Sequence, residues 1–349
     1  MEYRRLGNSG LLVSVYSFGA MTFGDGSGTY ANVGDTRGDE AGRQVDMCID
    51  AGINLFDTAD VYTNGQSEEL LGQILGKRRP NVLVATKCLG RMGPGPNDAG
   101  ASRHHIVAAC EASLKRLKTD YIDLYQIHNQ DLSTPIEETL RALDDLVTAG
   151  KVRYIGSSNH SGWTKMRALA TSDRLGLNRY VSQQIRYSLL DRASENELLP
   201  LGVDEGVGAL IWGPLASGYL SGKFQTGEDV SNTRIGSGAQ GTSSRDNEHT
   251  RSVLAVVGEI AKARGKSMSQ VALNWVRRKP GVATIIIGAR KTAQLEDNLA
   301  AATWSLNDEE MPRLDEASAT APIYPYDMHR FFTGERNPPR ANLPAPAQE

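Results

Sequence analysis

Several features that would assign this chain of 349 residues to a broad class are missing from it. No stretch reaches the roughly 18 uncharged apolar residues that a membrane-spanning helix needs. The start of the chain, residues 1–5, is charged, and no apolar core of a secretory signal peptide follows it. These absences argue against a membrane helix and against export, so we expect a cytoplasmic protein.

A strong charge and a cysteine pattern are missing as well. The chain has 38 Lys and Arg against 41 Asp and Glu, a formal net charge of -3, which gives no electrostatic basis for binding nucleic acid or an anionic membrane. Cys48, Cys88 and Cys110 are widely spaced and odd in number, so they fit neither a disulfide framework nor a zinc site. No carboxylates or histidines have the spacing of metal ligands, and we expect no metal.

The sequence does contain a regular alternation of short apolar runs and amphipathic helical stretches, from about residue 45 to 310. This pattern predicts repeated βα units and a parallel sheet. One helix is expected over residues 102–117 with Ser102 as its N-cap, and another begins at Ser67. The pattern as a whole predicts a single (β/α)8 TIM barrel. Its strand candidates are residues 12–17, 53–57, 82–87, 122–128, 152–158, 181–185, 208–212 and 283–288.

Some segments fall outside this alternation. Residues 1–11 contain a Gly-Asn-Ser-Gly turn and are expected to form a hairpin that closes the bottom of the barrel. Residues 91–101 and 222–250 are long loops at the carboxyl-terminal face, and the second has the position of a lid. We therefore assign residues 1–320 to one barrel domain and residues 321–349 to a C-terminal loop and a disordered tail.

Four polar residues, Asp57, Tyr62, Lys87 and His128, recur at one kind of place. Asp57, Lys87 and His128 each follow an apolar run that is typical of a buried strand, and Tyr62 lies five residues beyond Asp57. Because the carboxyl ends of all strands of a parallel barrel open onto one face, these side chains are expected to converge there. The sequence therefore predicts a proton-transfer site.

The chemistry of these residues supports that prediction. A buried lysine needs a counter-ion, and Asp57 at a neighbouring strand end is the natural partner of Lys87. An ammonium beside a phenol favours the phenolate and lowers its pKa from about 10, which makes Tyr62 a usable acid. The alternatives remain open at this point: a structural ion pair for Lys87, a packing role for Tyr62 and a simple hydrogen bond for His128.

The chain has no Rossmann or Walker glycine motif, yet its later strand ends carry polar clusters. Gly288 and Arg290 follow the last strand candidate and lead into a helix, whose N-terminus suits a phosphate. A solvent-exposed cationic loop is the alternative reading there. Trp212 either stacks on a flat ring or belongs to the core. The other polar clusters are residues 157–159, 183–184 and 213–218.

At these residues the sequence resembles the aldo-keto reductases, a family of TIM-barrel oxidoreductases that bind NADPH without a Rossmann fold. The resemblance covers roughly residues 3–318, and its most specific piece is Gly-Ile-Asn-Leu-Phe-Asp-Thr-Ala-Asp-Val-Tyr at residues 52–62. Supporting pieces are residues 68–72, 85–87, 113–128 and 150–159.

The resemblance implies roles for particular residues. Asp57, Tyr62, Lys87 and His128 take the places of the family's catalytic tetrad. Relatives often have a Lys-Ser pair where this chain has Gly-Ala at residues 288–289, so contact with the 2′-phosphate would depend mainly on Arg290. NADPH is then preferred, and use of NADH stays possible. The cofactor-binding positions implied are Ser158, Asn159, Gln184, Trp212, Leu215, Ser217, Gly218, Lys223, Gly288, Arg290, Gln294 and Asn298.

We therefore expect an NADPH-dependent enzyme that reduces an aldehyde or ketone, with Tyr62 as proton donor. One alternative is a cofactor-binding regulatory subunit, because potassium-channel β subunits resemble this fold. Another is a Schiff-base aldolase that uses Lys87 as nucleophile. The expected partner is a small carbonyl substrate, and the sequence does not define the oligomeric state. Loops near Met21, Tyr30, Arg91, Asn129 and residues 324–326 are expected to wall the substrate pocket.

Overall fold

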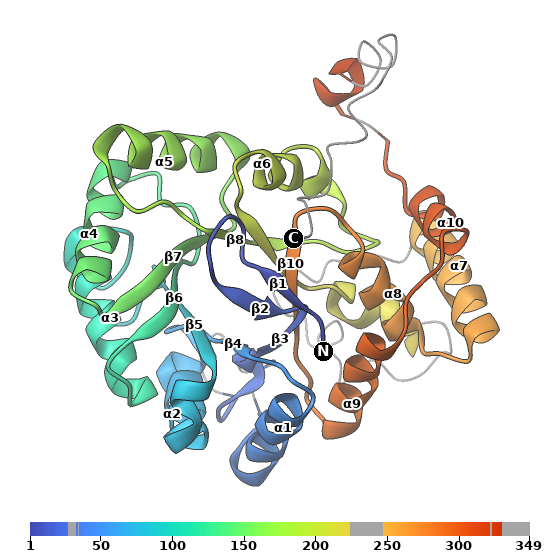
Figure 1. Ribbon diagram of the computed structural model, residues 1–349, viewed down its shortest axis with the longest axis horizontal. Coiled ribbons are helices and arrows are strands. Elements are labelled where there is room, and N and C mark those ends of the chain that lie inside the picture. The colour runs from blue at the N-terminus through green and yellow to red at the C-terminus, as the bar shows by residue number, and fades with distance from the viewer. Residues whose placement is uncertain (27–32, 34, 224–246, 322, 330–349) are drawn as a thin grey trace.

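The computed structural model describes residues 1–26, 33, 35–223, 247–321 and 323–329. Its centre is a closed barrel of eight strands, in which each neighbouring pair is parallel (Figure 1). The predicted TIM-type barrel is confirmed. The strands, in their order around the barrel, are β10 (Val282–Ile287), β3 (Tyr16–Gly19), β4 (Leu55–Asp57), β5 (Leu83–Cys88), β6 (Ile122–Ile127), β7 (Val152–Ser158), β8 (Ser182–Arg186) and β9 (Gly208–Trp212).

The first strand candidate, residues 12–17, was wrong as a single strand. Its first half is β2 (Leu12–Ser14), which pairs antiparallel with β1 (Tyr3–Arg5), and only its second half runs into the barrel strand β3. Between them the amide of Val15 donates to the carbonyl of Glu2 at 2.9 Å. No glycine or proline interrupts residues 11–18, so the sequence gives no sign of the change of partner.

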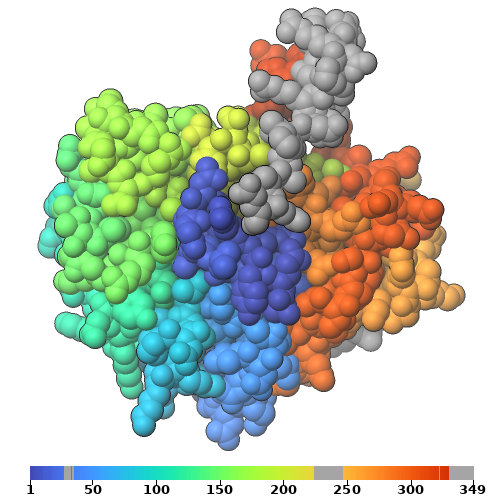
Figure 2. All heavy atoms as spheres, in the orientation of Figure 1, coloured from blue at the N-terminus to red at the C-terminus, as the bar shows by residue number. Residues whose placement is uncertain are grey.

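The hairpin β1–β2 closes the amino-terminal end of the barrel, as predicted. Leu6 and Val13 are fully buried and pack with the first residue of β4, Leu55, and with other side chains of the barrel interior. Figure 1 looks onto this hairpin, and Figure 2 shows the N-terminal segment covering the centre of the same face. The bottom of the barrel is thereby sealed, and the opposite end is left for chemistry.

Helices surround the barrel, and their inner faces bury the larger hydrophobic cluster against the strands. Ser102 is the N-cap of α3, as predicted, since its hydroxyl accepts from the amide of His105 at 3.3 Å. Helix α2 begins at Gln66, so Ser67 lies inside its first turn instead of capping it. The helices are α1 (Gly38–Asp50), α2 (Gln66–Leu75), α3 (Arg103–Leu117), α4 (Ile136–Thr148), α5 (Gly162–Leu175), α6 (Leu198–Asp204), α7 (Glu248–Arg264), α8 (Met268–Arg277), α9 (Thr292–Ala300) and α10 (Glu310–Ala317).

Two of these helices add to the regular alternation. Helix α7 precedes α8 after β9, and α10 follows α9 and packs against α7 (Figure 1). Most of the loop expected to act as a lid, residues 224–246, lies outside the described part of the chain, as does the tail from residue 330. None of the described helices is both long and apolar enough to cross a membrane. Cys48, Cys88 and Cys110 are buried free thiols.

Alternation along the strands fills the two ends of the barrel differently. On β5, Ala85 belongs to the apolar cluster in the lower part of the barrel interior. Two residues later, Lys87 belongs to the group of polar side chains around Asp57. On β6, Leu124 and Gln126 divide in the same way. Successive inward side chains on a strand are two residues apart, so these two strands each place an apolar residue low in the barrel and a polar one at the carboxyl end.

Candidate active site

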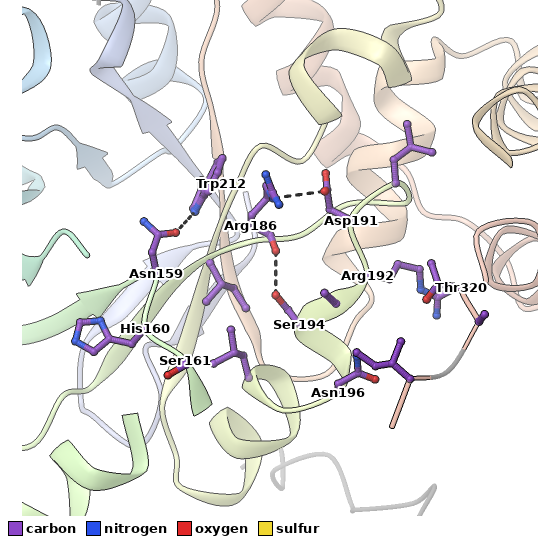
Figure 3. Close-up of a pocket in the computed structure, with 16 residues that line it drawn as sticks. Asn159, His160, Ser161, Arg186, Asp191, Arg192, Ser194, Asn196, Trp212 and Thr320 are labelled. Carbon is purple, nitrogen blue, oxygen red and sulfur yellow. Dashed lines mark hydrogen bonds and ion pairs between the residues drawn. The ribbon is translucent and has the colours of Figure 1, made fainter. Parts of the chain in front are cut away.

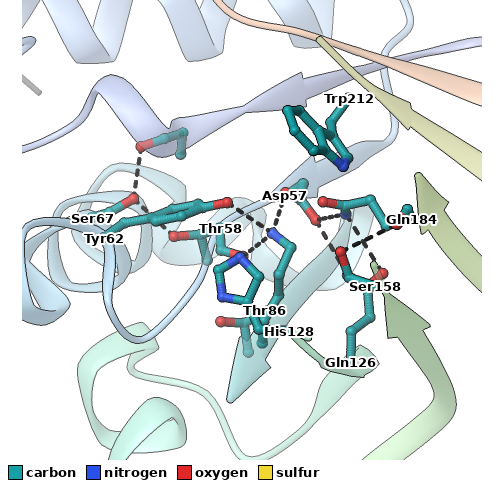
Figure 4. Close-up of polar contacts among 12 residues, drawn as sticks. Asp57, Thr58, Tyr62, Ser67, Thr86, Gln126, His128, Ser158, Gln184 and Trp212 are labelled. Atoms are coloured by element: carbon teal, nitrogen blue, oxygen red, sulfur yellow. Dashed lines mark hydrogen bonds and ion pairs between the residues drawn. The ribbon is translucent and has the colours of Figure 1, made fainter. Parts of the chain in front are cut away.

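The predicted tetrad comes together at the carboxyl end of the barrel, where Lys87 contacts Asp57 and Tyr62, and Tyr62 lies beside His128. Figure 4 shows Asp57, Tyr62 and His128 grouped there. The Lys87 side chain is fully buried. Its Nζ donates to Oδ1 of Asp57 at 2.5 Å, to the carbonyl of Thr58 at 2.7 Å and to the hydroxyl of Tyr62 at 3.3 Å. An ammonium has three hydrogens, and here each has an acceptor. The arrangement fixes the Lys87 side chain with one donor aimed at the phenol.

The carboxylate of Asp57 is fixed from both sides. While Oδ1 accepts from Lys87, Oδ2 accepts from Nε2 of Gln184 at 2.8 Å and from Nε2 of Gln126 at 3.3 Å. Asp57 is 3% exposed, so these donors replace the water that a carboxylate needs. Gln126 was not predicted as a site residue, because the strand that carries it was read as a continuous apolar run.

The loop that carries Tyr62 is fastened across the end of β5. The backbone amide of Thr58 donates to the carbonyl of Ala85 at 2.8 Å, and the backbone amide of Asp60 donates to the carbonyl of Lys87 at 3.2 Å. The Thr58 hydroxyl lies 2.8 Å from that of Ser67, which donates to the carbonyl of Ala20 at 2.7 Å. The backbone before Tyr62 is therefore tied to β5, to α2 and, through Ser67, to the residue that follows β3, and this fixes the position of the phenol.

His128 lies beside the phenol, directly after β6. Its ring is nearly perpendicular to that of Tyr62, with ring centres 5.6 Å apart. Its backbone amide donates to the carbonyl of Cys88 at 2.9 Å. Burial in the protein, and in second place the positive charge of Lys87, together lower the pKa of His128 to about 3. The imidazole is therefore neutral near pH 7 and can donate a hydrogen bond without carrying a charge.

A second set of charges lies behind the tetrad. Glu68, in the first turn of α2, is fully buried and accepts from the hydroxyl of Thr86 and from Nε of Arg116, both at 2.6 Å. Asp60 is also fully buried, and burial together with the nearby charge of Glu68 raises its pKa to about 8. The burial of these two carboxylates could not be predicted from the sequence, because acidic residues near the start of a helix are usually exposed to solvent.

Four of the predicted cofactor residues form a connected platform next to Asp57. Nε1 of Trp212 donates to Oδ1 of Asn159 at 3.0 Å, and Nδ2 of Asn159 donates to Oγ of Ser158 at 3.0 Å. Ser158 in turn donates to the carbonyl of Gln184 at 3.2 Å. Asn159 has a φ of 54°, a left-handed conformation that asparagine tolerates better than most residues. The indole lies over this platform, half-buried, at the barrel mouth (Figure 4).

The remaining predicted cofactor residues lie on two further segments. Leu215 precedes a turn in which Ser217 and Gly218 have φ values of 60° and 99°, and the amide of Gly218 donates to the carbonyl of Leu215 at 2.9 Å. Lys223 is exposed at the end of this segment. Beyond β10, Gly288 and Arg290 lead into α9, and Oε1 of Gln294 accepts from the amide of Arg290 at 3.3 Å. Asn298 lies one helical turn further on, nearly buried.

These residues fit a nicotinamide dinucleotide. Gln184 commits its Nε2 to Asp57, which leaves its Oε1 as the acceptor for a carboxamide, while Trp212 offers an aromatic face. The N-terminus of α9, beside Arg290, binds the carboxylate of Glu40 through the amide and hydroxyl of Thr292, and such a helix end suits negatively charged groups. The platform around Trp212 therefore suits a flat ring that carries an amide, and the start of α9 suits a negatively charged group.

Comparison with known proteins agrees with this geometry. Residues 17–319 match the model of the Aldo/keto reductase family. A probable voltage-gated potassium channel subunit beta of Arabidopsis thaliana is 39% identical over 86% of this chain and 91% of its own length. Versiconal hemiacetal acetate reductase of Aspergillus parasiticus is 34% identical over 93% of this chain and 99% of its own. The uncharacterized oxidoreductase YrpG of Bacillus subtilis is 38% identical over 90% and 95%.

The match spans nearly the whole barrel, and the resemblance drawn from the sequence is confirmed. Members of this family are oxidoreductases that act on carbonyl groups and generally use nicotinamide cofactors. The chain belongs to the Aldo/keto reductase family.

Proposed function

We propose that the protein reduces an aldehyde or ketone to an alcohol with NADPH, and that Tyr62 is the proton donor. The observation that carries this proposal is the Lys87 ammonium, which donates at once to Asp57 at 2.5 Å and to the Tyr62 hydroxyl at 3.3 Å inside the barrel mouth. An ammonium in this position stabilises the negative charge that grows on the phenol oxygen as its proton leaves.

A bound NADPH supplies the hydride, and the other tasks fall to side chains of this chain. Negative charge develops on the substrate oxygen during reduction, and Tyr62 transfers its proton to that oxygen. His128, neutral near pH 7, donates a hydrogen bond that orients the carbonyl. Asp57 holds Lys87 in place, and Gln126 and Gln184 hold Asp57.

Cofactor binding would use the platform around Trp212, the turn that follows Leu215 and the start of α9. Ser158, Asn159 and Gln184 would take the carboxamide, and Trp212 would stack on the ring. Leu215, Ser217, Gly218 and Lys223 would take the pyrophosphate. Gly288, Arg290, Gln294 and Asn298 would take the adenosine end, where the guanidinium of Arg290 favours the 2′-phosphate of NADPH over the hydroxyl of NADH.

The test is a panel of carbonyl compounds, including small aliphatic and aromatic aldehydes, ketones and quinones, assayed by the loss of NADPH absorbance. Turnover of at least one class, abolished by Tyr62→Phe, supports the proposal. Turnover that survives Tyr62→Phe would remove Tyr62 from the role of proton donor, and absence of turnover across the panel would remove the reductase assignment.

A second candidate has a specific observation in its favour, because relatives at 39% and 38% identity are described as probable potassium channel β subunits. A regulatory subunit would bind NADPH without steady turnover, so the same panel separates the two. The Schiff-base alternative requires a neutral amine, whereas Lys87 donates three hydrogen bonds, one of them to a carboxylate. Trapping a carbonyl compound on Lys87 with borohydride would revive it.

A further inference from the structure

The two ends of the proposed cofactor site differ in the charges that surround them. At the platform, Nε1 of Trp212 donates to Oδ1 of Asn159 at 3.0 Å (Figure 3). Beside it, the guanidinium of Arg186 lies 3.4 Å from the carboxylate of Asp191, so these charges are paired where the ring is proposed to bind. At the start of α9, where the 2′-phosphate is proposed to bind, a carboxylate already lies on the helix end.

This carboxylate is that of Glu40, which belongs to α1. Its Oε1 accepts from the backbone amide of Thr292 at 2.9 Å and from the hydroxyl of the same residue at 2.6 Å. The first turn of α9 contains no acidic residue, and the side chain of its N-cap residue, Lys291, makes no capping hydrogen bond. Glu40 therefore supplies, from another helix, the negative charge that a helix N-terminus favours.

Neighbouring side chains on α1 hold Glu40 in this position. Nη2 of Arg43 donates to its Oε2 at 2.7 Å, and Nε2 of Gln44 donates to its Oε1 at 3.3 Å. The hydrogen bond from Thr292, followed by that from Arg43, lowers the pKa of Glu40 to about 2. The carboxylate is therefore ionised near neutral pH. Its side chain is 31% exposed, so a group that arrives from solvent can approach it.

The charge of Glu40 opposes that of Arg290 at this helix end. Arg290 lies two residues before Thr292 and is half-buried, and its guanidinium attracts a phosphate. A carboxylate repels a phosphate but accepts a hydrogen bond from a hydroxyl, the group that NADH carries in place of the 2′-phosphate. In Rossmann folds, an acidic residue that binds this hydroxyl is associated with the use of NAD. Arg290 therefore favours NADPH, and Glu40 favours NADH.

We propose that Glu40 is a specificity-determining residue, whose carboxylate weakens binding of the 2′-phosphate at the start of α9 and so keeps NADH in use beside NADPH. The inference rests on the proposed cofactor site. Selectivity is a difference between two affinities, and a repulsive group lowers one of them. With Glu40 and Arg290 opposed, the protein discriminates between the two cofactors less than Arg290 alone would allow.

The test replaces Glu40 and titrates NADPH and NADH by intrinsic fluorescence without substrate. Glu40→Gln removes the charge and keeps a side-chain oxygen that can accept from Thr292, so the contact between α1 and α9 is preserved. We expect the Kd of NADPH to fall by about fivefold or more, equivalent to about 1 kcal/mol, and the Kd of NADH not to fall. Asp39→Asn is the matched control, because Asp39 is exposed in the same turn of α1, and it should change neither value.

A salt series separates repulsion from a change of structure. The Debye length falls from about 10 Å at 0.1 M salt to about 3 Å at 1 M, so repulsion at a partly exposed carboxylate is screened. The advantage of Glu40→Gln over wild type in binding NADPH should therefore shrink as salt is added. A displacement of α1 against α9 would change the affinity for both cofactors, and its effect would persist in salt.

An unchanged Kd of NADPH in Glu40→Gln, or an equal change for both cofactors, would overturn the inference. The same gain in Asp39→Asn would also overturn it, because the gain would then follow from net charge alone. The titration requires no turnover, so the two proposals can fail separately. If the protein reduced no carbonyl compound and Glu40→Gln still gained affinity for NADPH alone, the reductase proposal would fail and the role of Glu40 would stand.

Discussion

Two buried lysines in this barrel face tyrosine rings at almost the same distance, and only one of them has a counter-ion among the described residues. Nζ of Lys87 lies 4.9 Å from the ring centre of Tyr62, and Nζ of Lys165 lies 5.0 Å from that of Tyr180. Lys87 donates to the carboxylate of Asp57. Among the residues that the structure describes, none accepts a hydrogen bond from Nζ of Lys165. Burial lowers the pKa of Lys165 to about 7.

Each pair also has a histidine at its side. The ring of His160 lies 6.1 Å from its tyrosine in an edge-on arrangement, compared with 5.6 Å for His128. Burial, with the neighbouring lysine charge as the second cause, lowers the pKa of His160 to about 4 and that of His128 to about 3. Tyrosine, lysine and histidine in contact therefore do not by themselves make a proton-transfer site. The carboxylate and the position at the barrel mouth distinguish the first group from the second, which is packed between α5 and the barrel.

The largest expected effect is a loss of turnover when Tyr62, but not Tyr180, is replaced by phenylalanine. Tyr62→Phe removes the proposed proton donor, so kcat should fall by about 10²–10⁴-fold, while NADPH affinity measured by fluorescence titration stays within a factor of two. Tyr180→Phe is the matched control. It removes a buried hydroxyl that has no hydrogen-bond partner among the described residues, and turnover should be retained. A Tyr62→Phe variant that keeps more than about a tenth of wild-type turnover would contradict the assignment.

Lys87→Met should be inactive, and raising the pH should not restore it, because the phenol loses the neighbour that stabilises its charge. The variant leaves Asp57 buried with only two amide donors. Loss of one partner of a buried ion pair typically costs about 3–5 kcal/mol, so the free energy of unfolding should drop by that order. Urea unfolding measures the stability, and a steady-state pH profile measures the rate. Near-normal rates would reduce Lys87 to a structural partner of Asp57.

Lys165→Met should have the opposite effect on stability. The folded-state pKa of Lys165, about 7, lies below its ordinary value of 10.5, so folding releases a proton between these two pH values and buries a charged ammonium below pH 7. The penalty is complete below pH 7 and disappears as the pH rises to 10.5. At about 1.4 kcal/mol per unit of pKa shift, the variant should gain at most ~5 kcal/mol at pH 6 and little at pH 10. Urea unfolding at both values checks this, and a pH-independent difference would contradict it.

The comparison also explains which parts of the molecule were predictable. Asp57, Lys87 and His128 stand out because each ends an apolar run, and a parallel barrel brings all such ends together. Lys165 gives no such signal, since it lies between polar and apolar residues on a helix and reads as a solvent-facing position. Gln126 was missed because its strand was read as a continuous apolar run. Only the packed structure shows which polar side chains turn inward.

The smallest expected effect concerns a third cation, Arg290, which differs from both lysines in being half-buried at a helix N-terminus. Only NADPH carries a 2′-phosphate, and one charge-assisted contact to it is worth roughly 1.5–3 kcal/mol, or about ten- to a hundred-fold in affinity. Arg290→Ala should therefore weaken NADPH by that factor and NADH hardly at all. Its neighbour Lys291 is exposed, so Lys291→Ala should have the lesser effect. Titration of both cofactors by intrinsic fluorescence, with Trp212 as reporter, decides the matter. Equal weakening of the two cofactors would place the phosphate site elsewhere, because a contact with the shared part of the dinucleotide cannot discriminate between them.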